Sequence, residues 1–359
     1  MLRHYHERVT DQPRGPVTIY DVARAAGVAP STVSRTFARP GRVNAATAER
    51  VRQAAEQLGY RSTRVAHGQP STRTQLLGVM VSDVANPFYS QLIRGAQLTA
   101  NELGYEILVA DSRESGKRER AALERLIPVV EGFVIGSSRM PDSALRMIAK
   151  QRPMVALNRA LTDVPSVTTD NAGGARAVLE HLHALHHDDV HYVSGPEASW
   201  PEGVRLRALR DRAAELGIAL HRVGPVRPTF EGGLSAARML AEQRPSAVIA
   251  YNDLIAVGVM HGLLQAGMRI PEQVSVTGFD DILIARLVLP TLTTIAAPMR
   301  QMGATAVGNV VAMINGARSQ ATEPMVMPVR LRVRGSTAQR SLNRVSPALG
   351  TTSVSGSAS

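Results

Sequence analysis

Residues 17–37 read VTIYDVARAAGVAPSTVSRTF, and this stretch determines how the first part of the chain folds. Thr18 can cap a first helix, with Asp21 at its third helical position. Gly27 permits the left-handed conformation that a tight corner between two helices needs, and Pro30 suits the first position of a second helix. Two short helices joined in this way are typical of a helix-turn-helix, whose second helix lies in the major groove of DNA.

The helix that begins near Pro30 is predicted to carry polar side chains on its outer face and apolar ones on its inner face. The outward residues are Ser31, Thr32, Ser34 and Arg35, and the inward residues are Val33 and Phe37. A third helix is expected from Asn44, a good N-cap, with Val51, Ala54, Ala55 and Leu58 on its apolar face. Residues 17–60 are therefore predicted to form a small all-α domain.

The basic charge of the chain is concentrated near its beginning. The net charge is +11, and residues 1–76 contain 12 Arg, no Lys and 5 Asp or Glu, which leaves +7 in that segment. A local basic surface attracts a polyanion through counterion release. On charge alone, a solubilising surface without a partner is the alternative. The chain has no Cys, which excludes disulfides, zinc–thiolate sites and Cys nucleophiles.

Composition divides the rest of the chain into further segments. Residues 1–16 are expected to be a disordered arm, residues 61–75 a polar linker or hinge, and residues 339–359 a disordered, low-complexity tail. The first residues lack an apolar core of the kind that a signal peptide has, and no apolar run is long enough to span a membrane. We expect a cytoplasmic protein without membrane contact.

Residues 76–338 alternate short apolar runs with amphipathic helices. The predicted strands are Leu76–Val81, Glu106–Ala110, Gly132–Ile135, Met154–Leu157, Val190–Ser194, Ala247–Ala250 and Val274–Phe279. The predicted helices include Phe88–Leu103, Ala172–Leu185, Val204–Leu216 and Asp253–Ala266. Alternation of this kind favours mostly parallel sheets with helices on both faces, so the fold class of this part is α/β.

Residues 17–60 resemble the head of the LacI/GalR family of bacterial regulators. The resemblance lies in Val17 to Val28, in Ser31 to Arg35, and in Ala48 to Arg52 followed by Leu58 to Tyr60. It implies phosphate contacts from Thr18, Tyr20, Thr32, Ser34, Arg42, Asn44 and Tyr60. It also implies base contacts from Ser31 and Arg35, and a guanidinium can offer two donors to guanine. A small helical domain with solvated Arg side chains is the alternative.

The chain departs from this family in the head and in the segment that follows it. Ala29 replaces the usual Ser cap of the second helix, which removes about 1 kcal/mol, and Pro30 replaces a residue that often reads a base. In the hinge segment, Gln69 stands where the family has a Leu wedge, and Gly68 costs a helix about 1 kcal/mol. We expect one base contact fewer and a weak hinge, with Arg64 and Val65 as remaining minor-groove contacts.

The second part resembles the sensor domain of the same family, which is related to periplasmic sugar-binding proteins. The shared motifs are Asn86 to Tyr89, Asp170-Asn171, Ser194 to Pro196, Asn252-Asp253, Gly278 to Asp281 and Arg334 to Ala338. The resemblance implies two doubly wound lobes after a small all-α helix-turn-helix domain, with three crossings near Asp170, Pro298 and Met325. A ligand cleft is expected between the lobes, at the carboxyl ends of the strands.

Polar side chains at those strand ends suit a small polyhydroxylated ligand. The resemblance places Asn86, Phe88, Asn158, Asn252 and Asp280 in the cleft, with Trp200, Asp83 and Ser112 as further candidates. For Asp253 and Asp281 a helix cap or a loop end is an equal alternative, and Phe88 is also explained as a core residue. Gly203 is interpreted as the position where the family has its ligand-gripping Arg, and Arg205 as a structural Arg. The ligand is therefore expected to be unusual or absent.

Other functions are less well supported by the residues. His181, His183, His186, His187 and His191 lie together, but their place at a helix end explains them without a metal. Hydrolase, nucleotide-binding and metalloprotease motifs are missing. We therefore predict a DNA-binding transcriptional regulator that represses its targets and needs no cofactor. The prediction is a homodimer on a near-palindromic operator, modulated by a small-molecule effector such as a sugar. The alternatives are the same regulator with a ligand-independent sensor, or an enzyme on a similar scaffold.

Overall fold

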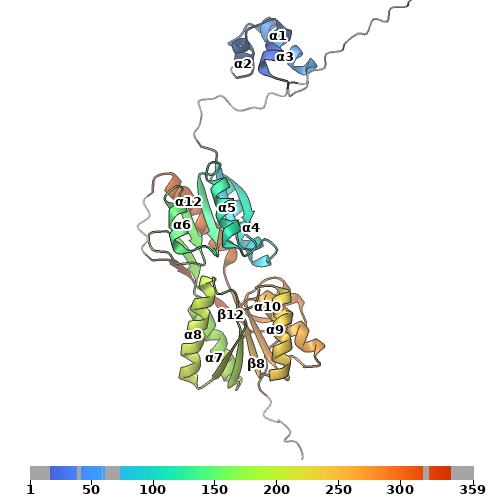
Figure 1. The fold of residues 1–359 in the computed structure, drawn as a ribbon, viewed down its shortest axis with the longest axis vertical. Coiled ribbons are helices and arrows are strands. Elements are labelled where there is room, and N and C mark those ends of the chain that lie inside the picture. Colours follow the sequence, from blue (N-terminus) through green and yellow to red (C-terminus); the bar gives the residue numbers. More distant parts are fainter. Residues whose placement is uncertain (1–16, 39–41, 59, 61–72, 318–322, 341–359) are drawn as a thin grey trace, which may run out of the picture. The chain divides into compact units, whose positions relative to one another are not determined.

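The computed structural model describes residues 17–38, 42–58, 60, 73–317 and 323–340 (Figure 1). The chain forms two compact units, residues 1–73 and 74–359. The predicted arm, the predicted tail from residue 341 and most of the predicted linker, including Arg64 and Val65, lie outside the described residues. Within the described ranges, no helix combines the length and the apolar character that crossing a membrane requires.

The first unit contains the three predicted helices, and its first corner is built as the sequence predicts. The helices are α1 (Ile19–Ala26), α2 (Pro30–Ala38) and α3 (Ala45–Gln57). The backbone N–H and the hydroxyl of Thr18 donate to the Asp21 carboxylate at 2.9 and 2.6 Å, which caps α1. Gly27 ends α1 in the left-handed conformation, with φ 64°, and the Val28 N–H donates to the Ala23 carbonyl.

A small apolar core holds these helices together. Val22, Val33 and Val51, one from each helix, are fully buried. The predicted inward position of Phe37 is wrong, because 38% of this residue is exposed and its ring lies beside that of Tyr60. Thr36 is buried instead, and its hydroxyl donates to the Thr32 carbonyl one turn earlier. The helix therefore turns its Val33–Thr36 side to the core.

The first lobe of the second unit is a six-stranded parallel sheet with the order β11-β5-β4-β3-β1-β2. Its elements are β1 (Leu76–Val81), α4 (Pro87–Glu102), β2 (Glu106–Asp111), α5 (Gly116–Leu126), β3 (Gly132–Gly136), α6 (Asp142–Ala149), β4 (Met154–Leu157), β5 (Ser166–Thr169), α12 (Met299–Ile314) and β11 (Met325–Met327). In β1, Leu77, Val79 and Val81 pack beneath α4 and α12, whereas Met80 packs against the cluster beneath α5 and α6. Both faces of the sheet are therefore covered.

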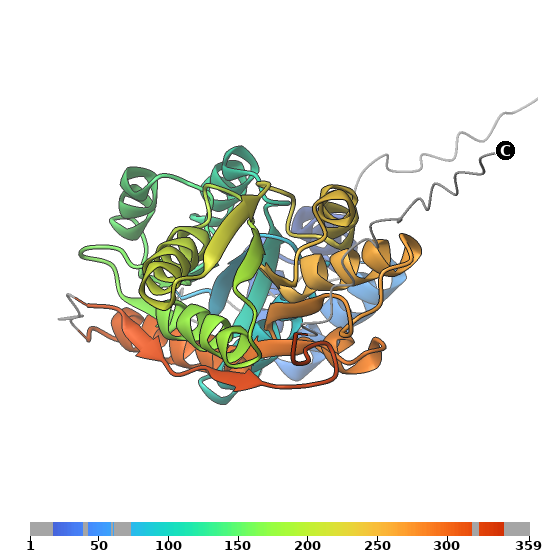
Figure 2. The ribbon, with the colours of Figure 1, turned by 90° about the horizontal axis from the view of Figure 1, so that it is seen from below.

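The second lobe repeats this plan in a sheet with the order β12-β10-β9-β8-β6-β7, in which only β12 is antiparallel to its neighbour. Its elements are α7 (Asn171–Ala184), β6 (Asp189–Val193), α8 (Trp200–Leu216), β7 (Ala219–Val223), α9 (Phe230–Gln243), β8 (Ala247–Ala250), α10 (Asp253–Gln265), β9 (Ser275–Asp280), α11 (Ile284–Leu287), β10 (Thr293–Ala296) and β12 (Arg330–Arg332). Figure 2 shows helices on both sides of the central strands. The predicted α/β fold of two doubly wound lobes is confirmed.

The chain crosses between the lobes three times. It leaves the first lobe between β5 and α7, at Asp170, and returns between β10 and α12, at Ala297 and Pro298. The third crossing joins β11 to β12 at Pro328 and Val329, a few residues after the predicted Met325. The strands that the sequence did not predict, among them β7, β11 and β12, are short and carry exposed or polar residues. Such strands lack the apolar run by which a buried strand is recognised.

Helices α4 and α12 approach each other closely because glycines face the contact. A Cβ added to Gly95 would lie 1.9 Å from the Arg300 carbonyl oxygen, and one on Gly303 would lie 2.0 Å from that of Leu92. By contrast, a Cβ at Gly308, also on α12, would meet no heavy atom within 4 Å. The backbones of α4 and α12 are thus in direct contact at two points.

We predict that Gly95→Ala lowers the free energy of unfolding by about 1–3 kcal/mol, because the added methyl group forces the two helices apart. The matched change Gly308→Ala is expected to raise it by about 0.5–1 kcal/mol, since alanine favours the helix and nothing obstructs its Cβ. Urea unfolding followed by the fluorescence of Trp200, the only tryptophan, measures both. Equal effects of the two substitutions would contradict the close helix contact.

Candidate functional site

The outer face of α2 presents the side chains that the sequence predicted there. Ser31 and Arg35 are exposed and lie four residues apart, so they share one face of the helix. Arg35 forms no ion pair with any described residue and is available to a partner. Thr32 and Ser34 are half-buried on either side of this face.

The remaining predicted phosphate-contacting residues lie around the helix ends of the same unit. Thr18, Tyr20, Arg42 and Asn44 are exposed, Tyr20 to 66%. The Asn44 side chain accepts a hydrogen bond from the Ala46 N–H at 3.0 Å and caps α3, as predicted. Tyr60 is half-buried against the core of the unit.

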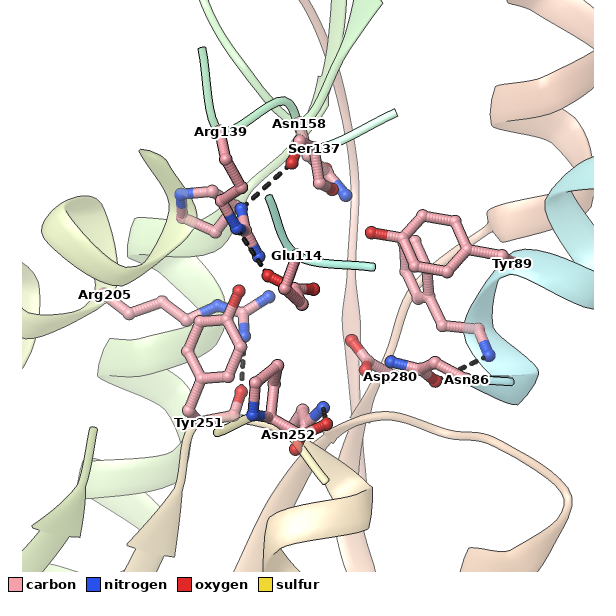
Figure 3. Close-up of a pocket in the computed structure, with 13 residues that line it drawn as sticks. Asn86, Tyr89, Glu114, Ser137, Arg139, Asn158, Arg205, Tyr251, Asn252 and Asp280 are labelled. Carbon is pink, nitrogen blue, oxygen red and sulfur yellow. Dashed lines mark hydrogen bonds and ion pairs between the residues drawn. The ribbon is translucent and has the colours of Figure 1, made fainter. Parts of the chain in front are cut away.

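In the second unit, a cavity that is partly open to solvent lies between the two lobes (Figure 3). Its walls come from segments that follow β1, β2, β3 and β4 in one lobe, and from α8, the segment before α9, the residues after β8, and the end of β9 in the other. Five of the predicted ligand residues line it, namely Asn86, Phe88, Asn158, Asn252 and Asp280. The residues that the resemblance assigned to the cleft, nearly 200 positions apart in the chain, therefore meet at the carboxyl ends of the parallel strands.

Three further candidates lie elsewhere. Trp200 is the first residue of α8 and is half-buried, but it does not line the cavity. Ser112 is buried, and its hydroxyl lies 3.4 Å from the Ser82 carbonyl, away from the cavity wall. Asp83 lines a wider, open hollow that adjoins the cavity and shares Glu114 and Pro228 with it, and Asp83 accepts a hydrogen bond from the Ala85 N–H.

The expectation that the cleft lacks its arginine is wrong. Gly203 is exposed, and a Cβ added to it would meet nothing within 4 Å. Arg205, predicted to be structural, lines the cavity and is only 6% exposed. Its guanidinium donates to the Asn171 side-chain oxygen at 2.8 Å and to the Tyr251 carbonyl at 2.5 Å, and it lies 3.9 Å from the centre of the Phe279 ring.

A second arginine, Arg139, reaches the cavity from the first lobe and was missed by the sequence reading. Its Nε donates to Glu114 at 2.6 Å and its Nη1 to the Ser137 carbonyl at 3.0 Å. Burial opposes the charged form, but the nearby Tyr251 and the Glu114 carboxylate together hold the Arg139 pKa above its usual value. A signal for this residue existed, because residues 137–139 directly follow a predicted strand, as Asn158 does.

The two asparagines that begin helices at the cavity use part of their amides for structure. The Asn86 oxygen accepts from the Phe88 N–H at 3.0 Å and caps α4. The Asn252 oxygen accepts from the Ile255 N–H at 2.9 Å, and its amide donates to the Pro228 carbonyl at 3.2 Å. Asn158 differs, because its side-chain oxygen is buried at the cavity without a hydrogen-bond partner among the described residues. A ligand donor would satisfy it.

Asp253 and Asp280 form a buried acidic pair in the second lobe. Asp253 is fully buried and accepts hydrogen bonds from the Thr294 hydroxyl at 2.5 Å and the Ile282 N–H at 2.9 Å, so it is neither a helix cap nor a loop end. Asp281 instead pairs with Arg334 and Arg286, outside the cavity. Burial raises the pKa of Asp280 to about 7, against the opposing effect of Arg205.

Two members of the histidine cluster, His181 and His187, are held by side-chain hydrogen bonds. His187 is buried, and its two ring nitrogens lie 3.1 Å from the Ser246 hydroxyl and 3.0 Å from that of Ser275. Burial lowers its pKa and favours the neutral ring. In the part of the chain that the structure describes, no three His, Cys, Asp or Glu side chains converge on a point that could hold a metal ion.

Comparison with known proteins places both units in one family. Residues 18–62 match the bacterial regulatory proteins of the lacI family, and residues 179–337 match the periplasmic binding protein-like domain. The HTH-type transcriptional repressor CytR of Escherichia coli (strain K12) is 30% identical over 89% of this chain and 96% of its own length. The chain belongs to the lacI family of bacterial regulatory proteins. The regulator AscG of the same organism is 32% identical over 83% of the chain and 92% of its own length.

Solved structures of lacI-family regulators share this architecture. The lac repressor dimer bound to operator and the anti-inducer ONPF has a TM-score of 0.69 and 28% identity, covering 90% of this chain and 100% of that one. The CelR–cellobiose complex has a TM-score of 0.66 and 27% identity, covering 89% and 99%. Because the related members are HTH-type transcriptional regulators and repressors, this lacI-family chain is a DNA-binding transcriptional regulator.

We predict that Asp280→Asn stabilises the second unit at pH 8 and that the gain shrinks toward pH 5. Because the folded-state pKa of about 7 lies above the unfolded value of 3.8, the folded protein holds a proton that the unfolded chain has released between these values. The stability of the wild type therefore falls as pH rises through this window, and asparagine removes the loss. Thermal unfolding of both proteins between pH 5 and 8 measures the difference. A gain that is independent of pH would rule out a titrating Asp280.

Proposed function

We propose that this regulator acts as a homodimeric repressor, with α2 of each head in the major groove of one half-site of a near-palindromic operator. The observation that carries the proposal is the pair of exposed side chains on α2, Ser31 and Arg35, over a helix whose opposite side seals the core. The lac repressor structure, a dimer bound to operator, supports the dimeric arrangement.

Within this arrangement the side chains divide into two roles. Arg35 donates two hydrogen bonds to a guanine, and Ser31 reaches a neighbouring base edge. The phosphate contacts come from Thr18, Tyr20, Thr32, Ser34, Arg42, Asn44 and Tyr60, which fix the register of the head without reading sequence. Pro30 begins α2 without a base-reading group, so the base contacts on each half-site are fewer than usual.

The second unit acts as the sensor. A small molecule bound in the cavity contacts both lobes at once, so it favours one relative setting of the lobes. This setting couples to operator affinity by about 1–3 kcal/mol. The ligand is bound and not converted. A ligand-independent sensor is the alternative that Gly203 suggests. Gly203, however, does not line the cavity, whereas Arg139 and Arg205 do.

We predict that Arg35→Ala weakens binding to the preferred duplex by about 1–3 kcal/mol and lowers affinity for bulk DNA much less, because the lost contact is to a base. Arg52→Ala is the matched control, since Arg52 is an exposed arginine on α3 that pairs with Glu49. Selection from a random duplex pool identifies the preferred sequence, and fluorescence anisotropy then measures both affinities. If purified wild type prefers no duplex over competitor DNA at moderate salt, the proposed function fails.

The hinge hypothesis concerns residues outside the described ones and gives its own prediction. Because Gln69 stands where an apolar wedge is expected, the wild type should bend its operator only weakly. Gln69→Leu should increase both the bend and the affinity for the operator. Electrophoretic mobility of circularly permuted operator fragments measures the bend angle. A sharp central kink with the wild type would refute the hypothesis.

A further inference from the structure

We propose that the effector is an anionic polyhydroxylated molecule, and that Arg139 binds its carboxylate or phosphate group. The inference builds on the proposed sensor function, since it names the chemical class that the cavity selects. It assigns to Arg139 and Glu114 a role in specificity.

Arg139 is held rigidly at the cavity wall. Only 5% of its side chain is exposed, and its backbone N–H donates to the buried Glu119 carboxyl at 2.9 Å. Together with the bonds to Glu114 and the Ser137 carbonyl, this fixes Nε and Nη1 of the guanidinium. Its Nη2 has no hydrogen bond to a described residue, and the guanidinium points into the cavity (Figure 3). A buried, positioned donor with one free edge is suited to an incoming anion.

A second guanidinium faces the same cavity from the other lobe. Arg205 donates only to the side-chain oxygen of Asn171 and the carbonyl of Tyr251, which are both neutral acceptors. Among the described residues, no carboxylate oxygen lies within ion-pair distance of its guanidinium. The charge of Arg205 is therefore not matched by a direct partner.

The charges that line the cavity leave an excess of positive charge when Asp280 is protonated, which requires a pH below about 7. Four charged side chains contribute, namely Glu114, Arg139, Arg205 and Asp280. Glu114 is already paired with Arg139, and burial favours the neutral form of Asp280, whose pKa is raised to about 7. An uncompensated guanidinium in a buried site is costly, and an anionic ligand removes that cost.

The remaining polar groups indicate that the ligand also carries hydroxyl groups. The buried Asn158 oxygen has no partner, and the Asp280 carboxylate accepts no hydrogen bond from a described residue. The Asn158 oxygen needs a donor, and the neutral Asp280 carboxyl can both donate and accept, so hydroxyl groups of a ligand satisfy both residues.

The backbone conformation around Arg139 also supports a ligand-binding site. Glu114, Ser137 and Asn158 follow β2, β3 and β4 of one sheet, and all adopt left-handed conformations with φ of 58°, 49° and 51°. Such conformations are uncommon for residues other than glycine and cluster at ligand-binding sites. They aim the three side chains at one cavity.

The test compares matched ligands on the full-length protein. Isothermal titration at pH 6.5, below the Asp280 pKa of about 7, uses monosaccharides beside their uronic acids, aldonic acids and sugar phosphates. At least one acid or phosphate should bind ten-fold or more tightly than its neutral counterpart. Carboxylate and phosphate ligands form separate arms of the panel and identify which group Arg139 accepts.

Variants then assign the preference to Arg139. Arg139→Gln should weaken binding of the anion ten-fold or more and change binding of the neutral sugar less than three-fold. Arg118→Gln, an exposed arginine on α5 in the same lobe, is the matched control and should keep the preference. Glu114→Gln, which frees Arg139 of its carboxylate, should tighten anion binding and remains informative if Arg139→Gln fails to fold.

Three outcomes would overturn the inference. The neutral compound binds as tightly as its acid, no anion in the panel binds, or Glu114→Gln weakens anion binding. A neutral sugar that alters operator affinity would refute the anionic class and leave the proposed regulator intact. Loss of operator preference in the absence of any ligand would instead refute the proposed function.

Discussion

The carboxylate of Asp253 connects three elements of the second lobe. It is the first residue of α10, and it accepts hydrogen bonds from Thr294 in β10 and from the Ile282 N–H just after β9. Burial, and next the nearby Asp280, raise its pKa well above the usual value, so the two hydrogen bonds must offset a substantial desolvation cost. This interaction fixes the start of α10, the turn after Asp280 and the strand that leads back to the first lobe. The second-lobe wall of the cleft depends on it.

The first-lobe wall is built on a different principle. There, parallel strands β1 to β4 end side by side, and the loop after each one contributes a side chain to the cavity. Left-handed residues after β2, β3 and β4 turn these loops inward. Arg139 and Glu114 are then held by an ion pair that is itself mostly buried. The two walls therefore differ, because the second-lobe wall is anchored by the buried Asp253 and the first-lobe wall by the buried Arg139.

The two units of this lacI-family regulator are also stabilised by different features. The head has a core of few residues, so its capping box and its glycine corner contribute a large share of its order. The sensor has clusters of fully buried residues on both sheet faces and can accommodate buried polar groups at the cleft. A large apolar core is what allows a site with an unpartnered asparagine oxygen and an acid of raised pKa to persist.

Local sequence patterns were sufficient to predict much of the fold of this protein. The Thr18–Asp21 cap, Gly27 and Pro30 predict the head because a cap and a corner involve neighbouring residues, and strand–helix alternation predicts the parallel sheets. The resemblance to the family placed Asn86, Asn158, Asn252 and Asp280 at the cleft, and the carboxyl ends of parallel strands, which meet at one edge, give the physical reason. The exposure of Phe37 could not be predicted in this way, since it depends on how α2 packs against the other helices.

The tertiary structure determines which arginines line the cleft. Residues 203 and 205 of α8 point about 200° apart, so only the packing of α8 on its sheet determines that Arg205, and not Gly203, faces the cavity. The pairing of Arg139 with Glu114 joins loops 25 residues apart, and no periodicity in the sequence records it. The sequence by itself determined the elements and the edge at which the site forms, because these follow from local patterns. The tertiary structure decided which charges meet there, because that depends on helix phase and loop direction.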